Sequence, residues 1–126
     1  MDAFGSHFWM ALFEGQKRWT FFNSDDLASL RPCYKGSLDP TFDIDLAVAE
    51  RTLNPYSVVL KSGQVLFVPA GSPHRVENLT DSVAVSGNFI NKTNLETAVK
   101  HLKYNSIMDP RAADLLREFV DLKLVI

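Results

Sequence analysis

The stretch that decides the fold is Gly63-Gln64-Val65-Leu66-Phe67-Val68-Pro69-Ala70-Gly71-Ser72-Pro73-His74-Arg75-Val76-Glu77-Asn78. Its apolar run, residues 65–68, ends at Pro69, and a glycine and a second proline then turn the chain directly before His74. The residues that follow, 76–89, again have the composition of a strand. A histidine at the end of a tight turn between two strands is well placed to point into a barrel, where imidazole is a natural ligand for a transition metal. We therefore treat His74 as a candidate metal ligand; the alternative is a histidine that ends a strand and bonds to a backbone carbonyl.

The composition is that of a single globular domain. The chain has 126 residues, of which 46% are hydrophobic and 22% charged, with a net charge of −2. This charge predicts no general affinity for nucleic acid. No apolar run approaches the roughly 18 residues of a membrane span, and no basic segment followed by an apolar one marks a secretory signal. The single cysteine, Cys33, suits a reducing compartment, so we expect an intracellular protein, cytoplasmic or nuclear.

Two pairs of strand-like runs are each separated by a short break. Residues 8–14 and 17–22 are separated by Gly15 and Gln16, and residues 56–60 and 64–68 by a second glycine-containing break. A break of this kind between two runs is typical of a β-hairpin. Each pair is therefore predicted to form a hairpin.

Residues 82–89 alternate between a small, polar face and an apolar face. The polar face consists of Ser82, Ala84, Ser86 and Asn88, and the apolar face of Val83, Val85, Gly87 and Phe89. The apolar face suits packing against another layer. A purely structural barrel fills its interior with large apolar side chains, so small polar groups on an inward face predict room for a polar ligand. The alternative is the exposed polar face of an edge strand.

The C-terminal quarter has the pattern of two helices. Thr93 to Glu96 form a capping box, and Asp109 followed by Pro110 is a cap with a proline at the first helical position. We expect residues 1–92 to form a β-barrel and 93–126 a helical extension of the same domain. The apolar tail at 122–126 predicts either packing on the barrel or a contact between helices in a homodimer.

The spacing G-x5-P-x-G-x2-H-x3-N, from Gly63 to Asn78, matches the second conserved motif of the cupin superfamily. The longer phrase resembles the C-terminal half of a JmjC-type domain, the cupin branch of Fe(II)- and 2-oxoglutarate-dependent oxygenases. The resemblance covers residues 2–92. It implies a mainly β fold, a double-stranded β-helix (jelly-roll cupin) that is incomplete at its N-terminus and is followed by two C-terminal α-helices. In that family His74 is the distal iron ligand.

The second part of the resemblance is the pattern G-x-K-x-W at Gly15, Lys17 and Trp19. It implies that Lys17 pairs with the distal carboxylate of the co-substrate 2-oxoglutarate, for which a fixed ammonium is the physical requirement. The same register places Ser86 and Asn88 near 2-oxoglutarate and iron. Met10 departs from the pattern, because some hydroxylases of the family have a polar residue there that helps to hold the co-substrate.

The register also places Asp2 on the acidic position of the family's H-x-D motif, as a second iron ligand. The proximal histidine of that motif would stand one residue before Met1, so we expect a barrel truncated at its N-terminus. His7 stands five residues after Asp2, too far for the i, i+2 geometry that places two ligands on one face of a strand. We expect it at the rim or on the surface, with a ligand role as the alternative.

Three functions remain open on the sequence. The first is an Fe(II)- and 2-oxoglutarate-dependent oxygenase of JmjC type that hydroxylates a protein or another macromolecule, such as tRNA. The second is a catalytically inactive cupin fragment, or a scaffold or binding domain that lacks the proximal histidine. The third, a cupin that binds a sugar or an acid with a different metal, fits His74 but leaves Lys17 unexplained.

Overall fold

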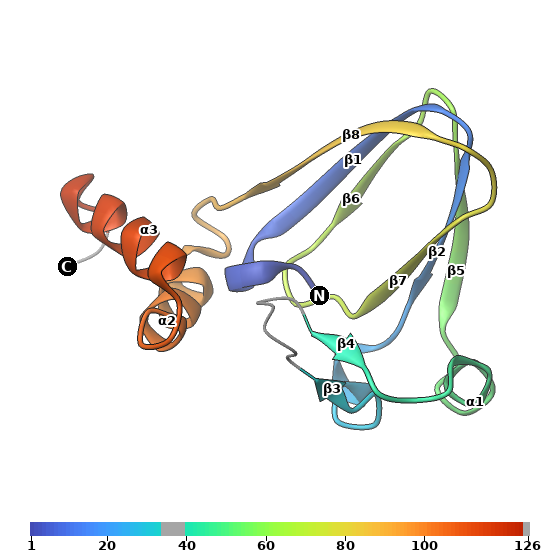
Figure 1. Cartoon of the computed structure of the whole chain (residues 1–126), viewed down its shortest axis with the longest axis horizontal. Coiled ribbons are helices and arrows are strands. Elements are labelled where there is room, and N and C mark those ends of the chain that lie inside the picture. Colours follow the sequence, from blue (N-terminus) through green and yellow to red (C-terminus); the bar gives the residue numbers. More distant parts are fainter. Residues whose placement is uncertain (34–39, 125–126) are drawn as a thin grey trace.

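The computed structural model describes residues 1–33 and 40–124, so Val125 and Ile126 of the predicted apolar tail lie outside the described residues. Six longer strands form the centre of the molecule, with a small two-stranded sheet and three α-helices around it (Figure 1). The strands are β1 (His7–Glu14), β2 (Gln16–Phe21), β3 (Pro32–Cys33), β4 (Thr41–Phe42), β5 (Tyr56–Lys61), β6 (Val65–Val68), β7 (His74–Asn78) and β8 (Val83–Phe89). The helices are the 3-10 turns η1 (Ala3–Gly5) and η2 (Ser24–Asp26) and the α-helices α1 (Leu46–Thr52), α2 (Leu95–Asn105) and α3 (Pro110–Asp121).

The six longer strands form two antiparallel sheets that face each other. One has the order β6-β1-β8 and the other β5-β2-β7. The chain crosses from one sheet to the other between β1 and β2, and again at each step from β5 to β8. This alternation is the winding of a double-stranded β-helix, and two helices follow it, so the predicted mainly β fold is confirmed.

Both predicted hairpins are wrong. β1 and β2 belong to different sheets, and so do β5 and β6. The glycine between β1 and β2 makes a corner instead of a hairpin turn. Gly15 has a φ of 87°, and a Cβ placed on it would come within 2.2 Å of the Asp81 carbonyl oxygen. The sequence correctly marked the break, but the partner of each strand is decided by packing between the sheets.

The main core lies between the two sheets. Its buried members are Leu12, Trp19, Leu60 and Val68, and half-buried residues such as Phe8, Met10 and Phe21 pack against them. This arrangement identifies the inner face of each sheet, because side chains alternate along a strand. A second, smaller core under α1 contains Phe22, Leu30 and Ala49.

The C-terminal helices are attached to the start of the chain. The buried Asn94 donates from Nδ2 to the carbonyl oxygens of Gly5 (3.0 Å) and Phe89 (3.4 Å), which joins η1, β8 and α2. Helix α3 begins at Pro110 and is capped by Asp109, as predicted, and it packs on α2. Within residues 1–33 and 40–124, no helix is long and apolar enough to cross a membrane.

Candidate functional site

The pairing of β2 with β7 places His74 and Lys17 on one face. Phe21 lies opposite His74, Trp19 opposite Val76, and Lys17 opposite Asn78. Since Trp19 is only 1% exposed between the two sheets, this is the inner face. The two candidate site residues are therefore four positions apart along the same inner wall, about 13 Å in an extended strand.

The side chain of His74 is fixed by its own turn. Nδ1 donates to the carbonyl oxygen of Ser72 at 2.9 Å. A carbonyl can only accept, so Nδ1 bears a proton, and in the neutral form of the ring the lone pair is then on Nε2. The ring is half-buried and lies 5.2 Å from the Trp19 ring between centroids. The backbone bond that the sequence offered as an alternative is thus present, and it is also the bond that orients a metal-ligating imidazole.

Lys17 is held on the inner wall by a polar neighbour. Its Nζ donates to Oδ1 of Asn78 at 2.6 Å, and its side chain is half-buried. On the other side Lys17 lies opposite Leu60, which is buried. Asn78 is the last residue of the motif that contains His74, but sequence analysis assigned it no function. The contact between two residues 61 positions apart is a product of the strand register alone.

Ser86 and Asn88 lie on the inner face of β8. They pair with Met10 and Phe8 of β1, whose side chains pack against the main core. Asn88 donates from Nδ2 to the Ser6 hydroxyl at 2.9 Å. Both residues are nevertheless exposed, because β8 is the edge strand of its sheet. Sequence analysis gave two alternatives for these residues, an inward polar face and the exposed face of an edge strand. The structure combines both.

Asp2 lies directly before η1, with extended backbone angles (φ −80°, ψ 154°) and no hydrogen bond from its side chain to the helix start. It is half-buried. In the described part of the chain, no three His, Cys, Asp or Glu side chains come together to hold a metal ion. A complete metal centre with three ligands from this chain is therefore not formed by these residues.

His7 joins three segments of the chain. Its Nδ1 accepts a hydrogen bond from the Ala70 backbone N–H (2.9 Å), so Nε2 has the proton and donates to the Thr93 hydroxyl (3.0 Å). Its ring also lies against Phe67 and Phe89. With both ring nitrogens bonded, His7 connects β1 to the turn before His74 and to the start of α2. No local sequence signal indicates this role, since its partners are 63 and 86 residues away.

Two facing antiparallel sheets that exchange consecutive strands, with a histidine turn leading into β7, define a double-stranded β-helix of the cupin type. A family model described as "JmjC domain, hydroxylase" matches residues 1–89. This match covers more than half of the chain, which therefore belongs to the JmjC domain family.

Several curated relatives are similar to the chain. It is 29% identical over 104 residues to the 2-oxoglutarate and iron-dependent oxygenase JMJD4 of Danio rerio, covering 75% of this chain and 24% of the relative. It is 32% identical over 101 residues to JMJD4 of Mus musculus (75% and 23%) and 26% identical over 133 residues to the arginine-specific demethylase JMJ22 of Arabidopsis thaliana (96% and 25%). The chain thus spans about a quarter of the length of the curated relatives it matches.

The names of the JMJD4 relatives include iron and 2-oxoglutarate, and the residues present fit these groups in part. His74 offers an imidazole in the tautomer that binds a metal through Nε2, and Lys17 offers an ammonium for a carboxylate. Between them lies Trp19, whose indole N–H is buried without a hydrogen-bond partner among the described residues. These features fit the anion and one metal bond, whereas the three protein ligands of a facial triad are not gathered.

Proposed function

We propose that this chain forms part of an Fe(II)- and 2-oxoglutarate-dependent oxygenase of JmjC type. The observation that supports this most directly is the inner wall of β2 and β7. A histidine in the metal-binding tautomer and a half-buried lysine project from this wall four positions apart. The Lys17 ammonium lies beside buried Leu60 and bonds to the neutral amide of Asn78, so its charge is not cancelled and remains available to a carboxylate.

Each predicted site residue has a role in this proposal. His74 binds iron through Nε2, Asp2 is the second ligand, and Lys17 binds the distal carboxylate of 2-oxoglutarate. Ser86 and Asn88 provide hydroxyl and amide groups on the facing inner wall, near the co-substrate. Iron(II) with 2-oxoglutarate, when bound, supplies activation of O2 for hydroxylation of a C–H bond, with succinate and carbon dioxide as by-products.

We further propose a protein or another macromolecule as the substrate, and hydroxylation as the reaction. Support comes from the JmjC domain match and from the relatives; two relatives are named arginine-specific demethylases, so product analysis must separate the two reactions.

We retain residues 1–92 as the barrel and 93–126 as its helical extension. The exposed apolar residues Ile107, Met108 and Val120 support a homodimer through the C-terminal helices. The single cysteine supports an intracellular location, cytoplasmic or nuclear.

The test is iron-dependent conversion of 2-oxoglutarate to succinate by the 126-residue chain. We expect turnover that is lost in His74→Ala and kept in His101→Ala. His101 is a matched control because it is exposed on α2, away from both sheets. Turnover that persists in His74→Ala, or Mn(II)-dependent binding of 2-oxoglutarate that is as tight in His74→Ala as in the wild-type chain, would contradict the proposal.

The second candidate is a cupin scaffold or binding domain without catalysis. The observation in its favour is that the described residues do not gather three metal ligands. It predicts a folded chain that binds Mn(II), used as a substitute for iron, no better than His74→Ala does. Calorimetric titration with Mn(II) separates the candidates, since wild-type binding that is lost in His74→Ala counts against the scaffold.

A further inference from the structure

The contact between Lys17 and Asn78 has a consequence for the kind of anion that the inner wall can accept. The two residues lie directly opposite each other on β2 and β7, and Nζ of Lys17 donates to Oδ1 of Asn78 at 2.6 Å. The neighbour of Lys17 on the other side of β2 is Leu60, a buried apolar residue. Within the described residues, Asn78 is therefore the polar side chain that the structure records against the ammonium.

An amide is well suited to hold an ammonium that must bind an anion. The Lys17 ammonium has three N–H donors, and Asn78 uses one of them, so two remain for a carboxylate. The amide is neutral, so it fixes the position of Nζ without cancelling its charge. With Oδ1 as the acceptor, the Nδ2 group of Asn78 is a further donor beside the same anion. A carboxylate in this place would instead form an ion pair and compete with the bound acid.

We propose that Asn78 is the positioning residue of Lys17, and that by fixing Nζ it determines which length of 2-oxo dicarboxylate the site accepts. A lysine side chain has four rotatable bonds, and an unheld ammonium would follow the carboxylate of a shorter or a longer acid. With Nζ bonded to the opposite strand, the distance from the ammonium to the His74 end of the wall is set by the β2–β7 register. This inference rests on the proposed function, since it assigns the selectivity of the same site.

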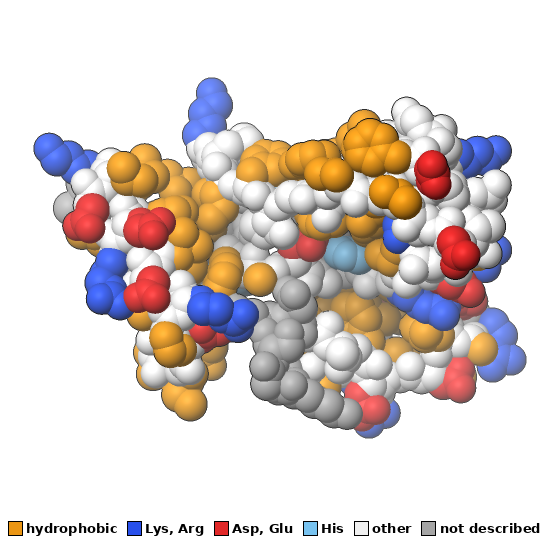
Figure 2. Space-filling model, turned by 45° about the horizontal axis from the view of Figure 1, so that its top comes forward, with side chains coloured by type: hydrophobic (Ala, Val, Ile, Leu, Met, Phe, Trp, Pro, Cys, Tyr) orange, Lys and Arg blue, Asp and Glu red, His pale blue; other side chains and the backbone are white. Residues whose placement is uncertain are grey.

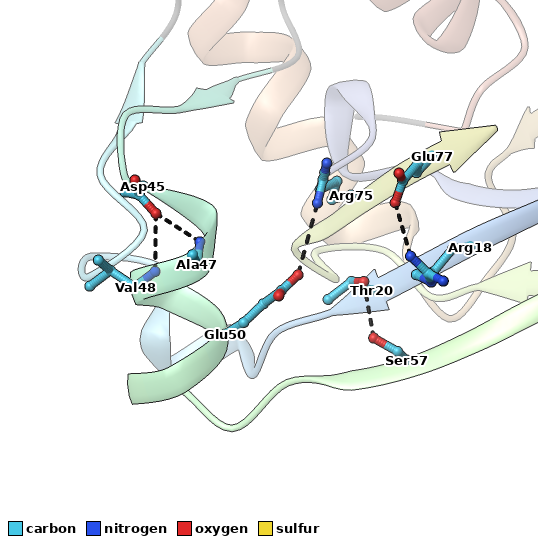
Figure 3. Close-up of polar contacts among 9 residues, drawn as sticks. All are labelled: Arg18, Thr20, Asp45, Ala47, Val48, Glu50, Ser57, Arg75 and Glu77. Carbon is cyan, nitrogen blue, oxygen red and sulfur yellow. Dashed lines mark hydrogen bonds and ion pairs between the residues drawn. The ribbon is translucent and has the colours of Figure 1, made fainter. Parts of the chain in front are cut away.

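The experiment measures the dissociation constants of 2-oxoglutarate and of 2-oxoadipate, which is one methylene longer, by calorimetry in the presence of Mn(II). The variants are Asn78→Ala, which removes the hydrogen bond, and Asn78→Asp, which keeps the shape but adds a charge. Glu77→Ala is the matched control: Glu77 is the neighbouring residue on β7, but it faces outward and pairs with Arg18 at 3.3 Å (Figure 3). Thermal unfolding shows that each variant is folded.

We expect Asn78→Ala to weaken 2-oxoglutarate binding about 10-fold, the size of a lost hydrogen bond to a charged group. We expect it to weaken 2-oxoadipate binding less, so that the preference for the shorter acid falls. Asn78→Asp should weaken both acids more than the alanine variant, and Glu77→Ala should change neither. A merely structural role of Asn78 would lower the unfolding temperature without changing the ratio of the two constants.

Three results would overturn the inference. If wild type binds 2-oxoglutarate and the Asn78 variants keep both its affinity and its preference, Asn78 does not position Lys17, while the proposed function remains. The same holds if the variants weaken both acids equally. If the wild-type chain binds neither acid in the presence of Mn(II), the proposed function fails and this inference fails with it.

Discussion

The outer faces of the two sheets differ sharply in chemistry. The outer face of β5-β2-β7 is polar: Arg18 pairs with Glu77, Arg75 with Glu50 of α1, and the Thr20 hydroxyl bonds to that of Ser57 (Figure 3). The outer face of β6-β1-β8 is apolar, and hydrophobic side chains gather over this sheet in Figure 2. Its exposed members are Phe13, Val65, Phe67, Val83 and Val85, each more than half exposed.

The difference indicates that the outer face of β5-β2-β7 suits contact with water, whereas that of β6-β1-β8 suits contact with another protein layer. Charged pairs that remain hydrated are stable in water as they are, whereas a contiguous apolar patch on a surface marks contact with another protein layer. The sequence predicted packing against another layer for the apolar face of β8. Val83 and Val85 are instead 55% and 52% exposed, so the described residues leave this face uncovered.

Substitutions in the core shared by both sheets should have the largest effect on the free energy of unfolding. Trp19→Ala removes the largest fully buried side chain between them and is expected to lower the free energy of unfolding by about 3–5 kcal/mol. Trp9→Ala is the matched variant, because Trp9 lies on the outer, apolar face over Gly87 and is half-buried. Urea unfolding should show a smaller loss for Trp9. Equal losses would mean that the apolar face is packed as tightly as the core.

Substitutions at the corner between the sheets should have the second-largest effect on the free energy of unfolding. Gly15→Ala places a Cβ against the Asp81 carbonyl at a positive φ and is expected to cost about 3 kcal/mol. Gly63→Ala has a similar φ of 82° with no atom within 4 Å of the new Cβ, so about 1 kcal/mol is expected from the backbone alone. Chemical denaturation of the two variants compares them. A cost at Gly15 no greater than at Gly63 would contradict the close crossing between the sheets.

The apolar outer face should be almost neutral for stability but important for contacts. Val83→Thr and Val85→Thr together keep β-branched side chains and should change the free energy of unfolding by only about 0.5 kcal/mol. They should reduce binding of the hydrophobic dye ANS and association at high protein concentration, followed by light scattering. A large loss of stability would show that these valines are buried in solution.

Substitutions on the polar outer face should have the smallest effect on the free energy of unfolding. Arg18 and Glu77 are 48% and 41% exposed, so a double-mutant cycle with alanine should yield a coupling of only about 0.2–1 kcal/mol. The coupling should fall further at about 1 M salt, where charges are screened over a few ångströms. A coupling well above that range, insensitive to salt, would show that this face is covered and not exposed to solvent.

The order of the strands along the chain could be predicted, but their partners could not. Alternation of side chains predicts which residues of a strand share a face, and it correctly placed Ser86 and Asn88 on one face. It does not state which strand lies beside which. Both glycine breaks were therefore assigned to hairpins, although the chain changes sheet at each of them.

The candidate site shows the same division. The motif from Gly63 to Asn78 identified His74, and the turn itself supplies the Ser72 carbonyl that fixes its tautomer, because both lie within two residues. The bonds of His7 to Ala70 and Thr93 join residues far apart in the chain, so no local pattern contains them. The same is true of the bond from Lys17 to Asn78.

The sequence by itself located β1, β2, β5, β6 and the two C-terminal helices, the turn that orients His74, and the ammonium and carboxylate candidates Lys17 and Asp2. Short-range geometry is sufficient for these, since periodicity, caps and turns act over a few residues. The sequence indicated residues 76–89 as a single strand-like stretch, whereas the structure has β7 and β8 there in different sheets. Only the tertiary structure decided the exchange of strands between sheets, the structural role of His7 and the contact between Lys17 and Asn78. These depend on register and on burial between distant segments, where many pairings satisfy the same local pattern and packing selects one.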